Sequence, residues 1–533
     1  MQHRPAALHA LPDRVRRGRT IVLGLDTVDL LLVERWAAEG HLPFFRKLLS
    51  ECPLVRLSAL SRVLQGALWP SVLTGVSPAH HGRYSFAQLA KGSYHLDPVR
   101  ADRVTLPRFY TVLGAHGVRC AAIDIPTDLP QPTFPGIQVV DWGTEFALWD
   151  FATQPSDFKD HIVARYGRHY HTDQPLTGET SANHRKVLGN LRTGVKQKSA
   201  LVRELLGRSD LDLIFVVYGE PHKAGHFFWK YMDAAHPDHV AAPDLEGALL
   251  EMYQLIDSEL EALAGLLDED DNLLVFTDHG MQANYRGEHF VDAILQRLGL
   301  SGSPAPAEGD SAISSPLRSS NTGRSVRQSV RGTLHKLVRT VAPAGVTRAL
   351  RDQFGAASGR NWSQTKAFSL PTDRNTYIRV NLRGREPLGT VSPGAEYEKL
   401  LDFIEREFRA LINVETGQPA VEEVFRVHEV YPGPRTDDLP DLAILWSSKS
   451  PINVLHSQTV GRLEKRIVEL RSGNHRPEGF LLARGPKFQP GQRLIQGDIL
   501  QIAPTLLALH DAPIPNDYAM GPIAELLARA SSH

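Results

Sequence analysis

Short apolar runs that end in polar residues constrain the fold of this chain more than any other feature of its sequence. The first run, at 20–26, reads Thr-Ile-Val-Leu-Gly-Leu-Asp and ends in a carboxylate. Runs of this kind are typical of strands that are buried on both faces of a parallel sheet. Similar runs recur at 118–125, 211–218, 272–277, 442–446 and 479–483.

Helical patterns lie between several of these runs. In the clearest one, apolar residues keep a spacing of three or four positions: Leu245, Leu249, Met252, Ile256, Leu260 and Leu263. Pro243 and Asp244 stand where this helix should begin. Strands that alternate with helices predict an α/β fold with a wound, mostly parallel central sheet flanked by helices. At 533 residues, the chain is long enough for such a core and for insertions.

Three of the predicted strands end in groups that bind metals. They are Asp26 after the first run, Glu220, His222 and His226 after the run at 211–218, and Asp278 and His279 after the run at 272–277. Because ligands gather at the carboxyl ends of the strands in a wound sheet, we expect these side chains to meet there. The chain has only two cysteines, so a metal site must use histidines and carboxylates.

Each of these groups also has an ordinary structural explanation. The Asp-His-Gly triplet at 278–280 is a common polar turn after a strand. His222 and His226 lie four residues apart, so they can share a metal if the segment is helical, and are otherwise structural histidines. His475, in the polar loop at 473–479, would by itself be a surface histidine, but it offers the third imidazole that such a site needs.

The composition excludes several other classes of protein. Apolar residues make up 42 % and charged residues 22 %, as in ordinary globular enzymes, and a net charge of −1 gives no general affinity for nucleic acid or membranes. No segment reaches the roughly 20 apolar residues of a transmembrane span or has the form of a signal peptide. Because Cys52 and Cys120 cannot form a disulfide framework, we expect a soluble, cytoplasmic protein.

Changes in composition predict five parts of the chain. They are a flexible basic tail (1–19), the first part of the core (20–300), a flexible Ser/Gly/Pro-rich insertion (301–332), a cap region (333–435) and the C-terminal part of the core (436–533). The interval 311–351 has no acidic residue and eight lysines and arginines. It is either a solvated surface or a clamp for an anionic substrate or a membrane surface.

Further motifs follow one another along the chain. They are Gly40-His-Leu-Pro43, Trp69-Pro-Ser-Val-Leu-Thr-Gly75 with Pro78-Ala-His-His-Gly82, the stretch at 220–226, Thr277-Asp-His-Gly280, His475 and Asp498-Ile-Leu-Gln-Ile-Ala-Pro-Thr505. In this order, after the strand that ends in Asp26, they resemble the motifs of the alkaline phosphatase superfamily, specifically its type I phosphodiesterase/nucleotide pyrophosphatase branch. The resemblance covers 20–527 apart from the insertion.

The resemblance implies a metal-dependent hydrolase of small-molecule phosphate esters, with two divalent ions, zinc or manganese. The substrate would be a phosphodiester, a phosphomonoester or a nucleotide pyrophosphate, with no specific nucleic-acid partner; oligomeric state is not indicated. The implied ligands are Asp26, Asp278 and His279 for one metal, and His226 and His475 for the other. His222 stands where the family usually has aspartate. A neutral ligand there raises the net charge of the site, which would weaken the second metal or change its identity.

The resemblance fails at the attacking group. The family places a threonine or serine nine residues before the threonine of its Thr-Gly pair, at a helix N-terminus. Counting back from Thr74 gives Gln65, which cannot attack phosphorus. Ser61, one turn earlier, is our candidate nucleophile, and Ser71 lies further into the predicted helix. The alternatives are a shifted alignment, direct attack by a metal-bound hydroxide, or lost catalysis.

Two other functions stay open at this point. A sulfatase or phosphonate hydrolase would use the same fold, but the Cys/Ser-x-Pro-x-Arg motif of the sulfatases is not found in the sequence. A pseudoenzyme that binds an anionic ligand or partner would keep the metal ligands with Gln65 in the nucleophile's place. Metal content and turnover distinguish these possibilities.

Overall fold

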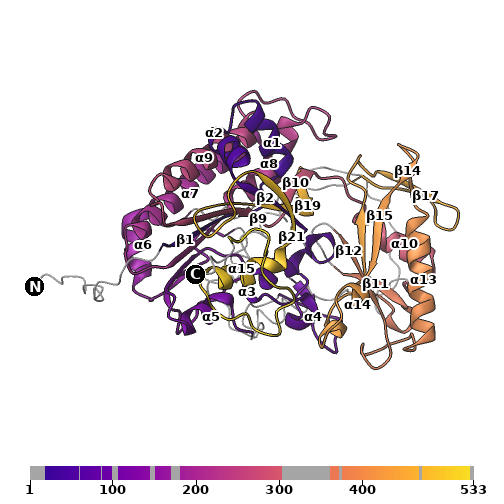
Figure 1. Cartoon of the computed structure of the whole chain (residues 1–533). Coiled ribbons are helices and arrows are strands. Elements are labelled where there is room, and N and C mark those ends of the chain that lie inside the picture. The colour runs from indigo at the N-terminus through magenta and orange to yellow at the C-terminus, as the bar shows by residue number, and fades with distance from the viewer. Residues whose placement is uncertain are drawn as a thin grey trace, which may run out of the picture.

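The computed structural model describes residues 18–58, 60–85, 87–98, 106–144, 151–169, 180–302, 360–370, 375–466 and 471–528. A nine-stranded sheet forms the centre of the molecule (Figure 1). In spatial order its strands are β21 (Arg493–Asp498), β2 (Pro53–Ser58), β20 (Glu478–Arg484), β9 (Asn272–Thr277), β1 (Thr20–Leu25), β8 (Leu213–Tyr218), β5 (Cys120–Ile123), β6 (Gly136–Val140) and β7 (Ala152–Gln154).

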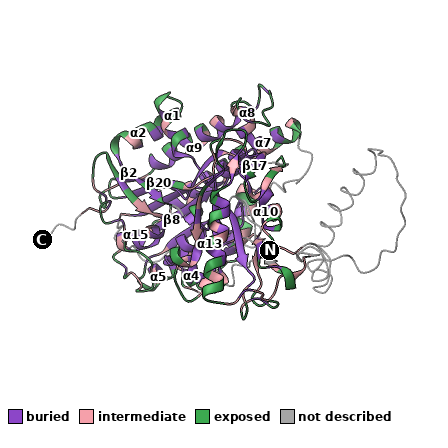
Figure 2. Cartoon of the chain, turned by 90° about the vertical axis from the view of Figure 1, so that its right-hand side faces the viewer, coloured by how far each residue is buried: buried purple, intermediate pink, exposed green. Residues whose placement is uncertain are grey.

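Five neighbouring strands of this sheet, from β9 to β6, run parallel. β20 pairs antiparallel with both β9 and β2, and β7 pairs antiparallel with β6 at one edge. β1, β8 and β9 are buried along their whole length, as strands covered on both faces should be (Figure 2). The predicted wound, mostly parallel α/β sheet is therefore confirmed.

Two layers of helices cover the sheet, because successive strand residues point to opposite faces. On β1, Ile21 and Leu23 belong to the core on one face, and Val22 belongs to the core on the other. The first face is covered by α1 (Leu30–Ala38), α2 (Pro43–Glu51), α7 (Ser181–Leu206), α8 (Glu220–Met232) and α9 (Ala248–Ala264). The second is covered by α3 (Leu68–Thr74), α5 (Phe109–Ala115) and α15 (Ile502–Leu509).

A second body of structure, mostly orange in Figure 1, lies beside the central sheet. Its antiparallel sheet contains β11 (Ala367–Leu370), β12 (Thr376–Val380), β16 (Leu442–Trp446) and β15 (Val421–Arg426). A smaller sheet contains β14 (Gln418–Pro419), β13 (Ile412–Asn413), β17 (Val454–Ser457) and β18 (Gly461–Glu464). α10 (Val291–Arg297) and α13 (Ala395–Arg409) pack in the same core. We refer to these elements together as the cap region.

The run at 442–446 was a wrong prediction, because it is not a strand of the parallel sheet. It is β16, which pairs antiparallel with β12 and β15. Leu442, Ile444 and Trp446 face one apolar core of the cap region, and Ala443 faces another. Because apolar cores cover both faces of β16, this antiparallel strand has the same continuous apolar pattern as a strand of a buried parallel sheet. The sheets of the cap region, as defined above, extend to Glu464.

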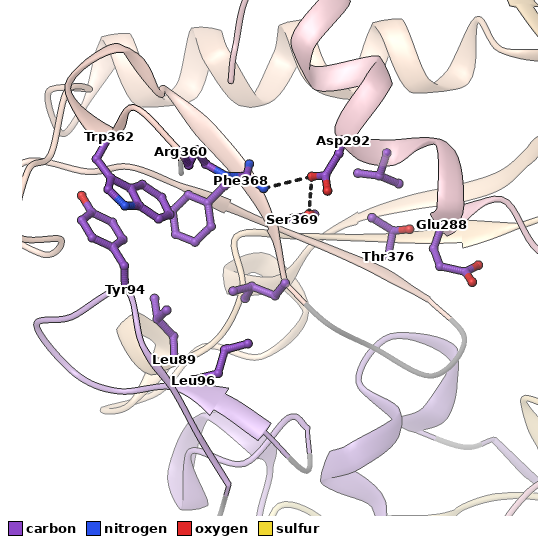
Figure 3. Close-up of a pocket in the computed structure, with 12 residues that line it drawn as sticks. Leu89, Tyr94, Leu96, Glu288, Asp292, Arg360, Trp362, Phe368, Ser369 and Thr376 are labelled. Carbon is purple, nitrogen blue, oxygen red and sulfur yellow. Dashed lines mark hydrogen bonds and ion pairs between the residues drawn. The ribbon is translucent and has the colours of Figure 1, made fainter. Parts of the chain in front are cut away.

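A cavity of about 390 Å³ lies between the cap region and the hairpin of β3 (Ala87–Leu89) and β4 (Leu96–Pro98) (Figure 3). Tyr94, in the turn of this hairpin, stacks on Trp362 with ring centroids 3.6 Å apart. Asp292 accepts hydrogen bonds from Arg360 and Ser369 on another part of the wall. The cavity is therefore aromatic and apolar, with one polar side.

Local predictions at element ends have mixed outcomes. The helix predicted to begin at Pro243 and Asp244 begins at Ala248, after a turn. Asp498 caps the short helix before α15 through a capping box with Gln501. Residues 1–17 of the predicted tail, 303–332 of the insertion and the basic interval 311–351 lie outside the described residues. Among the described residues, no helix is both long and apolar enough to cross a membrane.

Candidate metal centre

The carboxyl edge of the central sheet carries the predicted metal ligands. Asp26 directly follows β1, and Asp278 and His279 lie between β9 and β10 (Gly280–Ala283). α8 begins two residues after β8, so His222 and His226 lie one turn apart on the same face of that helix. The predicted ligands that follow three parallel strands therefore meet, because parallel strands end at the same edge of the sheet.

His475 reaches the same edge by a different route. It lies on β19 (Gly473–Arg476), which pairs antiparallel with β10 and places His475 opposite Met281. β20 follows directly, and because it runs antiparallel to β9, it begins where β9 ends. Because β20 is antiparallel to β9, His475, which lies just before β20, is close to the predicted ligands that follow the parallel strands.

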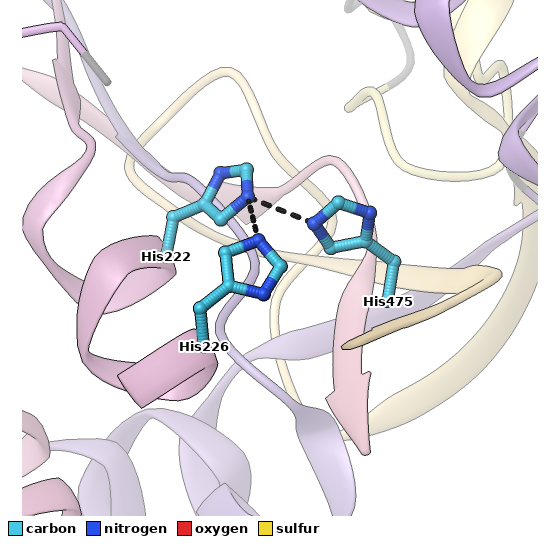
Figure 4. Close-up of side chains that lie close together, drawn as sticks. All are labelled: His222, His226 and His475. Carbon is cyan, nitrogen blue, oxygen red and sulfur yellow. Dashed lines mark hydrogen bonds between the residues drawn. The ribbon is translucent and has the colours of Figure 1, made fainter. Parts of the chain in front are cut away.

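The six side chains form two buried groups of three, and the ligand atoms in each lie within 4.8 Å of one another. We call Asp26, Asp278 and His279 the carboxylate cluster, and His222, His226 and His475 the histidine cluster (Figure 4). In the histidine cluster, Nε2 of His222 lies 2.9 Å from Nε2 of His226 and 2.8 Å from Nε2 of His475. Three ring nitrogens therefore converge on one point.

Contacts behind two of these rings indicate where their protons lie. Nδ1 of His226 lies 2.8 Å from the carbonyl oxygen of Gly473, which can only accept, so Nδ1 carries the proton. Nδ1 of His222 lies 3.1 Å from Oδ2 of Asp26, which favours a proton there too. Nε2 of His222 and Nε2 of His226 then each carry a lone pair, and the two lone pairs face each other. A cation bound between them would stabilise this arrangement.

The carboxylate cluster has the same need for positive charge. Oδ1 of Asp26 and Nε2 of His279 have no hydrogen-bond partner among the described residues, and Oδ2 of Asp278 lies 2.8 Å from Nδ1 of His279. Unpaired buried polar atoms cost about 1–3 kcal/mol each. Burial raises the pKa of Asp26 to about 6, with His222 lowering it and Asp278 raising it. A divalent cation would satisfy these atoms and neutralise both carboxylates.

Thr27 adopts a strained conformation beside this cluster. Its φ of 59° is costly for a β-branched residue. In this conformation its backbone N–H donates to Oδ1 of Asp278 at 3.2 Å. The strained turn therefore connects the ends of β1 and β9, and nothing in the sequence pattern marked Thr27 for this role.

The donor sets fit divalent metal ions. Three imidazoles suit zinc, and two carboxylates with one imidazole suit zinc or manganese. The contact between Asp26 and His222 joins the two clusters, so the two positions are neighbours. The structure thus brings all six predicted ligands together, and their role as ligands stays a prediction.

Ser61 is the candidate attacking group, and Ser71 is the second serine near it in the sequence. Ser61 lies in a short helix, Leu60–Arg62, and its side chain is outside the described parts of the structure. Oγ of Ser71 lies 2.8 Å from Nε2 of His81. The backbone N–H of Arg83 donates to Nδ1 of His81, so Nε2–H donates to Ser71 and cannot accept its proton. Burial, with the nearby Arg83, also lowers the pKa of His81 to about 3.

Gln65 contacts the histidine cluster directly. It begins the short helix η2 (Gln65–Ala67), and its side-chain amide contacts Nδ1 of His475. Its backbone N–H donates to the hydroxyl of Tyr377 on β12, at 3.0 Å. The position that the resemblance gives to the nucleophile thus holds a residue that lies between a predicted ligand and the cap region.

Glu220 belongs to a buried ion-pair group rather than to either cluster. Nζ of Lys198, on α7, lies 3.3 Å from Oε1 of Glu220 and 3.3 Å from Oδ2 of Asp124. His169 lies 2.9 Å from the same Glu220 oxygen. Burial raises the pKa of Glu220, but Lys198 and His169 outweigh it and bring the value to about 2. This group supports the start of α8, and no local sequence pattern indicates that Lys198 is buried.

Comparison with protein families adds to this geometry. The model of the type I phosphodiesterase/nucleotide pyrophosphatase family matches residues 20–443. The chain belongs to this family. It is a phosphoester hydrolase of the phosphodiesterase/nucleotide pyrophosphatase type. No curated protein matches the chain in sequence.

Several solved structures resemble the chain at low sequence identity. Alkaline phosphatase PafA is 12 % identical, with a TM-score of 0.51 over 98 % of this chain and 100 % of that one. Phosphonoacetate hydrolase from Sinorhizobium meliloti 1021 is 12 % identical, with a TM-score of 0.49 over 93 % and 96 %. Murine ectonucleotide pyrophosphatase/phosphodiesterase 5 is 11 % identical, with a TM-score of 0.47 over 96 % and 100 %. The likeness to alkaline phosphatase PafA supports the fold.

Proposed function

We propose that the two clusters hold two divalent metal ions, zinc or manganese, with which the protein hydrolyses small-molecule phosphate esters. The single observation that supports this most is the 3.1 Å contact between Asp26 and His222, which joins two buried groups of three ligands into one centre. Two bound ions would supply positive charge to the phosphoryl oxygens and to the leaving oxygen.

The surrounding residues orient the ligands. Asp26 and the carbonyl of Gly473 hold two imidazoles through Nδ1, so that Nε2 of each faces the histidine cluster. The amide of Thr27 fixes one oxygen of Asp278, and the other lies 2.8 Å from Nδ1 of His279 within the carboxylate cluster. Preorganised contacts of this kind raise the affinity of a site because little has to move on binding.

The cavity beside the cap region is the proposed site for the organic group of the substrate. Thr376 lines it, and Tyr377, which points to the opposite face of β12, contacts Gln65 at the metal centre. Its volume of about 390 Å³ lies within the range of small-molecule pockets. The aromatic walls favour an ester with a planar or apolar group.

The two cysteines support the proposed cytoplasmic location. Cys52 and Cys120 are both free and buried. Burial raises the pKa of the Cys52 thiol to about 11, so the thiol stays protonated and unreactive. Thiols kept in this state are compatible with a reducing compartment.

The direct test is metal content together with turnover. Metal-free protein dialysed against zinc or manganese should retain two equivalents by mass spectrometry and cleave bis(p-nitrophenyl) phosphate. Asp278→Ala and His279→Ala should each lose one equivalent and the activity. His456→Ala, on an exposed position of β17, is the matched control and should retain both.

Three results would contradict the proposal. Turnover retained by Asp278→Ala would exclude the carboxylate cluster from the reaction. Faster cleavage of p-nitrophenyl sulfate than of the phosphate ester would favour a sulfatase. Two bound metals with no turnover of any phosphate ester would favour a protein that only binds an anionic ligand.

A further inference from the structure

Each imidazole of the histidine cluster has a polar partner at Nδ1, on the side of the ring away from the cluster. The partners are the carboxylate of Asp26 for His222, the carbonyl of Gly473 for His226, and the side-chain amide of Gln65 for His475. A hydrogen-bond acceptor at this position fixes the tautomer of a metal-ligating histidine and turns its Nε2 lone pair toward the metal. The role of Gln65, the third partner, depends on the orientation of its side-chain amide.

The amide of Gln65 can accept from His475 in one orientation. The amide nitrogen of Gln65 faces Nδ1 of His475. The amide oxygen, Oε1, is buried without a hydrogen-bond partner among the described residues. Amide oxygen and nitrogen are assigned from the surrounding hydrogen bonds. Turning the amide by 180° places Oε1 against Nδ1–H of His475, which satisfies both atoms and leaves Nε2 of the histidine as a lone pair.

Contacts from the cap region hold Gln65 in this position. Its backbone N–H donates to the hydroxyl of Tyr377, whose ring packs edge-on against Tyr84 with centroids 5.9 Å apart. Asn375 donates to the carbonyl oxygens of Arg62 and Val63, just before Gln65, at 2.9 and 3.1 Å. The segment 375–377 therefore anchors the turn that carries Gln65 at two points.

We propose that Gln65 is a positioning residue for the third imidazole, with its amide oxygen accepting from Nδ1–H of His475. This rests on the proposed function, because it assumes that the histidine cluster holds a metal. Loss of one such partner typically lowers metal affinity by about 10–100-fold. Gln65 thus has a defined task at the site without being an attacking group.

Zinc titration of three metal-free proteins against a chromophoric chelator tests the proposal. Gln65→Met keeps the length of the side chain but removes the acceptor, and should weaken the histidine cluster about 10–100-fold. Gln65→Glu restores an acceptor and should bind at least as tightly as the wild type. The carboxylate cluster is the internal control, and its affinity should stay the same in all three proteins.

The outcomes separate this proposal from the proposed function. Two zinc ions in the wild type with unchanged affinity in Gln65→Met would overturn the role of Gln65 alone. If the wild type binds neither zinc nor manganese, the proposed function and this inference are both overturned. Long-range ¹H–¹⁵N spectra of the zinc-loaded wild type, labelled at histidine, give a second measurement that needs no variant to fold. They should show the proton of His475 on Nδ1, and a proton on Nε2 would overturn the proposal.

Discussion

Oδ2 of Asp26 lies 3.1 Å from Nδ1 of His222, so a carboxylate of one cluster orients an imidazole of the other. The two clusters are nevertheless unequal in charge. The carboxylate cluster has two anionic side chains, whereas the histidine cluster has three neutral ones. A cation bound at the histidine cluster therefore keeps its full charge, and the identity of residue 222 should govern which metal is preferred there.

Replacing His222 by aspartate should change this preference. The His222→Asp variant has one anionic ligand in the histidine cluster, and carboxylates favour manganese relative to imidazoles. We expect the preference for zinc over manganese to fall by at least tenfold, which corresponds to about 1.4 kcal/mol. Competition dialysis with mass-spectrometric metal analysis measures this ratio. His456→Asp controls for added negative charge, and an equal change in both variants would contradict the explanation.

The buried group around Lys198 should make stability depend on pH in the acidic range. The folded-state pKa of Glu220 is about 2, below its ordinary value of 4.5. Its contribution to the free energy of unfolding is therefore complete above pH 4.5 and is lost as the pH falls toward 2. The size of this contribution is about 3 kcal/mol. Urea unfolding of wild type and Glu220→Gln between pH 2 and 5 should converge at the acidic end, and parallel curves would refute the assignment.

The two serines should differ in their effect on turnover. Because Nε2–H of His81 donates to Ser71, the Ser71→Ala variant should keep kcat within about twofold and lose about 1 kcal/mol of stability with its hydrogen bond. Ser61→Ala should lower kcat by on the order of 10³-fold if Ser61 is the nucleophile, as the sequence predicts. Comparable activity of the two variants under saturating substrate would remove Ser61 from that role.

The cavity should affect the binding of large substrates. Trp362→Ala removes the ring that stacks on Tyr94 and widens the cavity. We expect KM to rise several-fold for phosphodiesters with an aromatic group, with kcat changed little, because the lost contact is made equally in ground and transition states. A methyl phosphodiester is the matched control substrate. An equal rise in KM for both substrates would show that the cavity does not hold the organic group.

Local sequence patterns predicted the parts of this site that depend on chain direction. Asp26, Asp278 and His279 follow buried parallel strands, and such strands all present their carboxyl ends at one edge. His475 has no such local signal, because β19 and β20 bring it to that edge through antiparallel pairing. Its prediction came from the resemblance to the family.

Other features depend on contacts that no local pattern records. Gln65 and His475 are 410 positions apart, and the amide contact between them follows only from the assembled fold. Lys198 has charged and polar neighbours in its helix and looks like a surface residue until Asp124 and Glu220 are placed beside it. β16 was misplaced because an apolar run records burial on both faces but not the direction of its partners.

The antiparallel return through β19 and β20 also affects the order in which the centre can form during synthesis. The ligands of the carboxylate cluster are all present in the chain by residue 279, whereas His475 is 253 positions beyond its neighbour His222. Chains fold from the N-terminus as they leave the ribosome. A nascent chain that has not reached β19 therefore has a complete carboxylate cluster and only two imidazoles. The final strands thus determine when the histidine cluster, the proposed second metal site, can be completed.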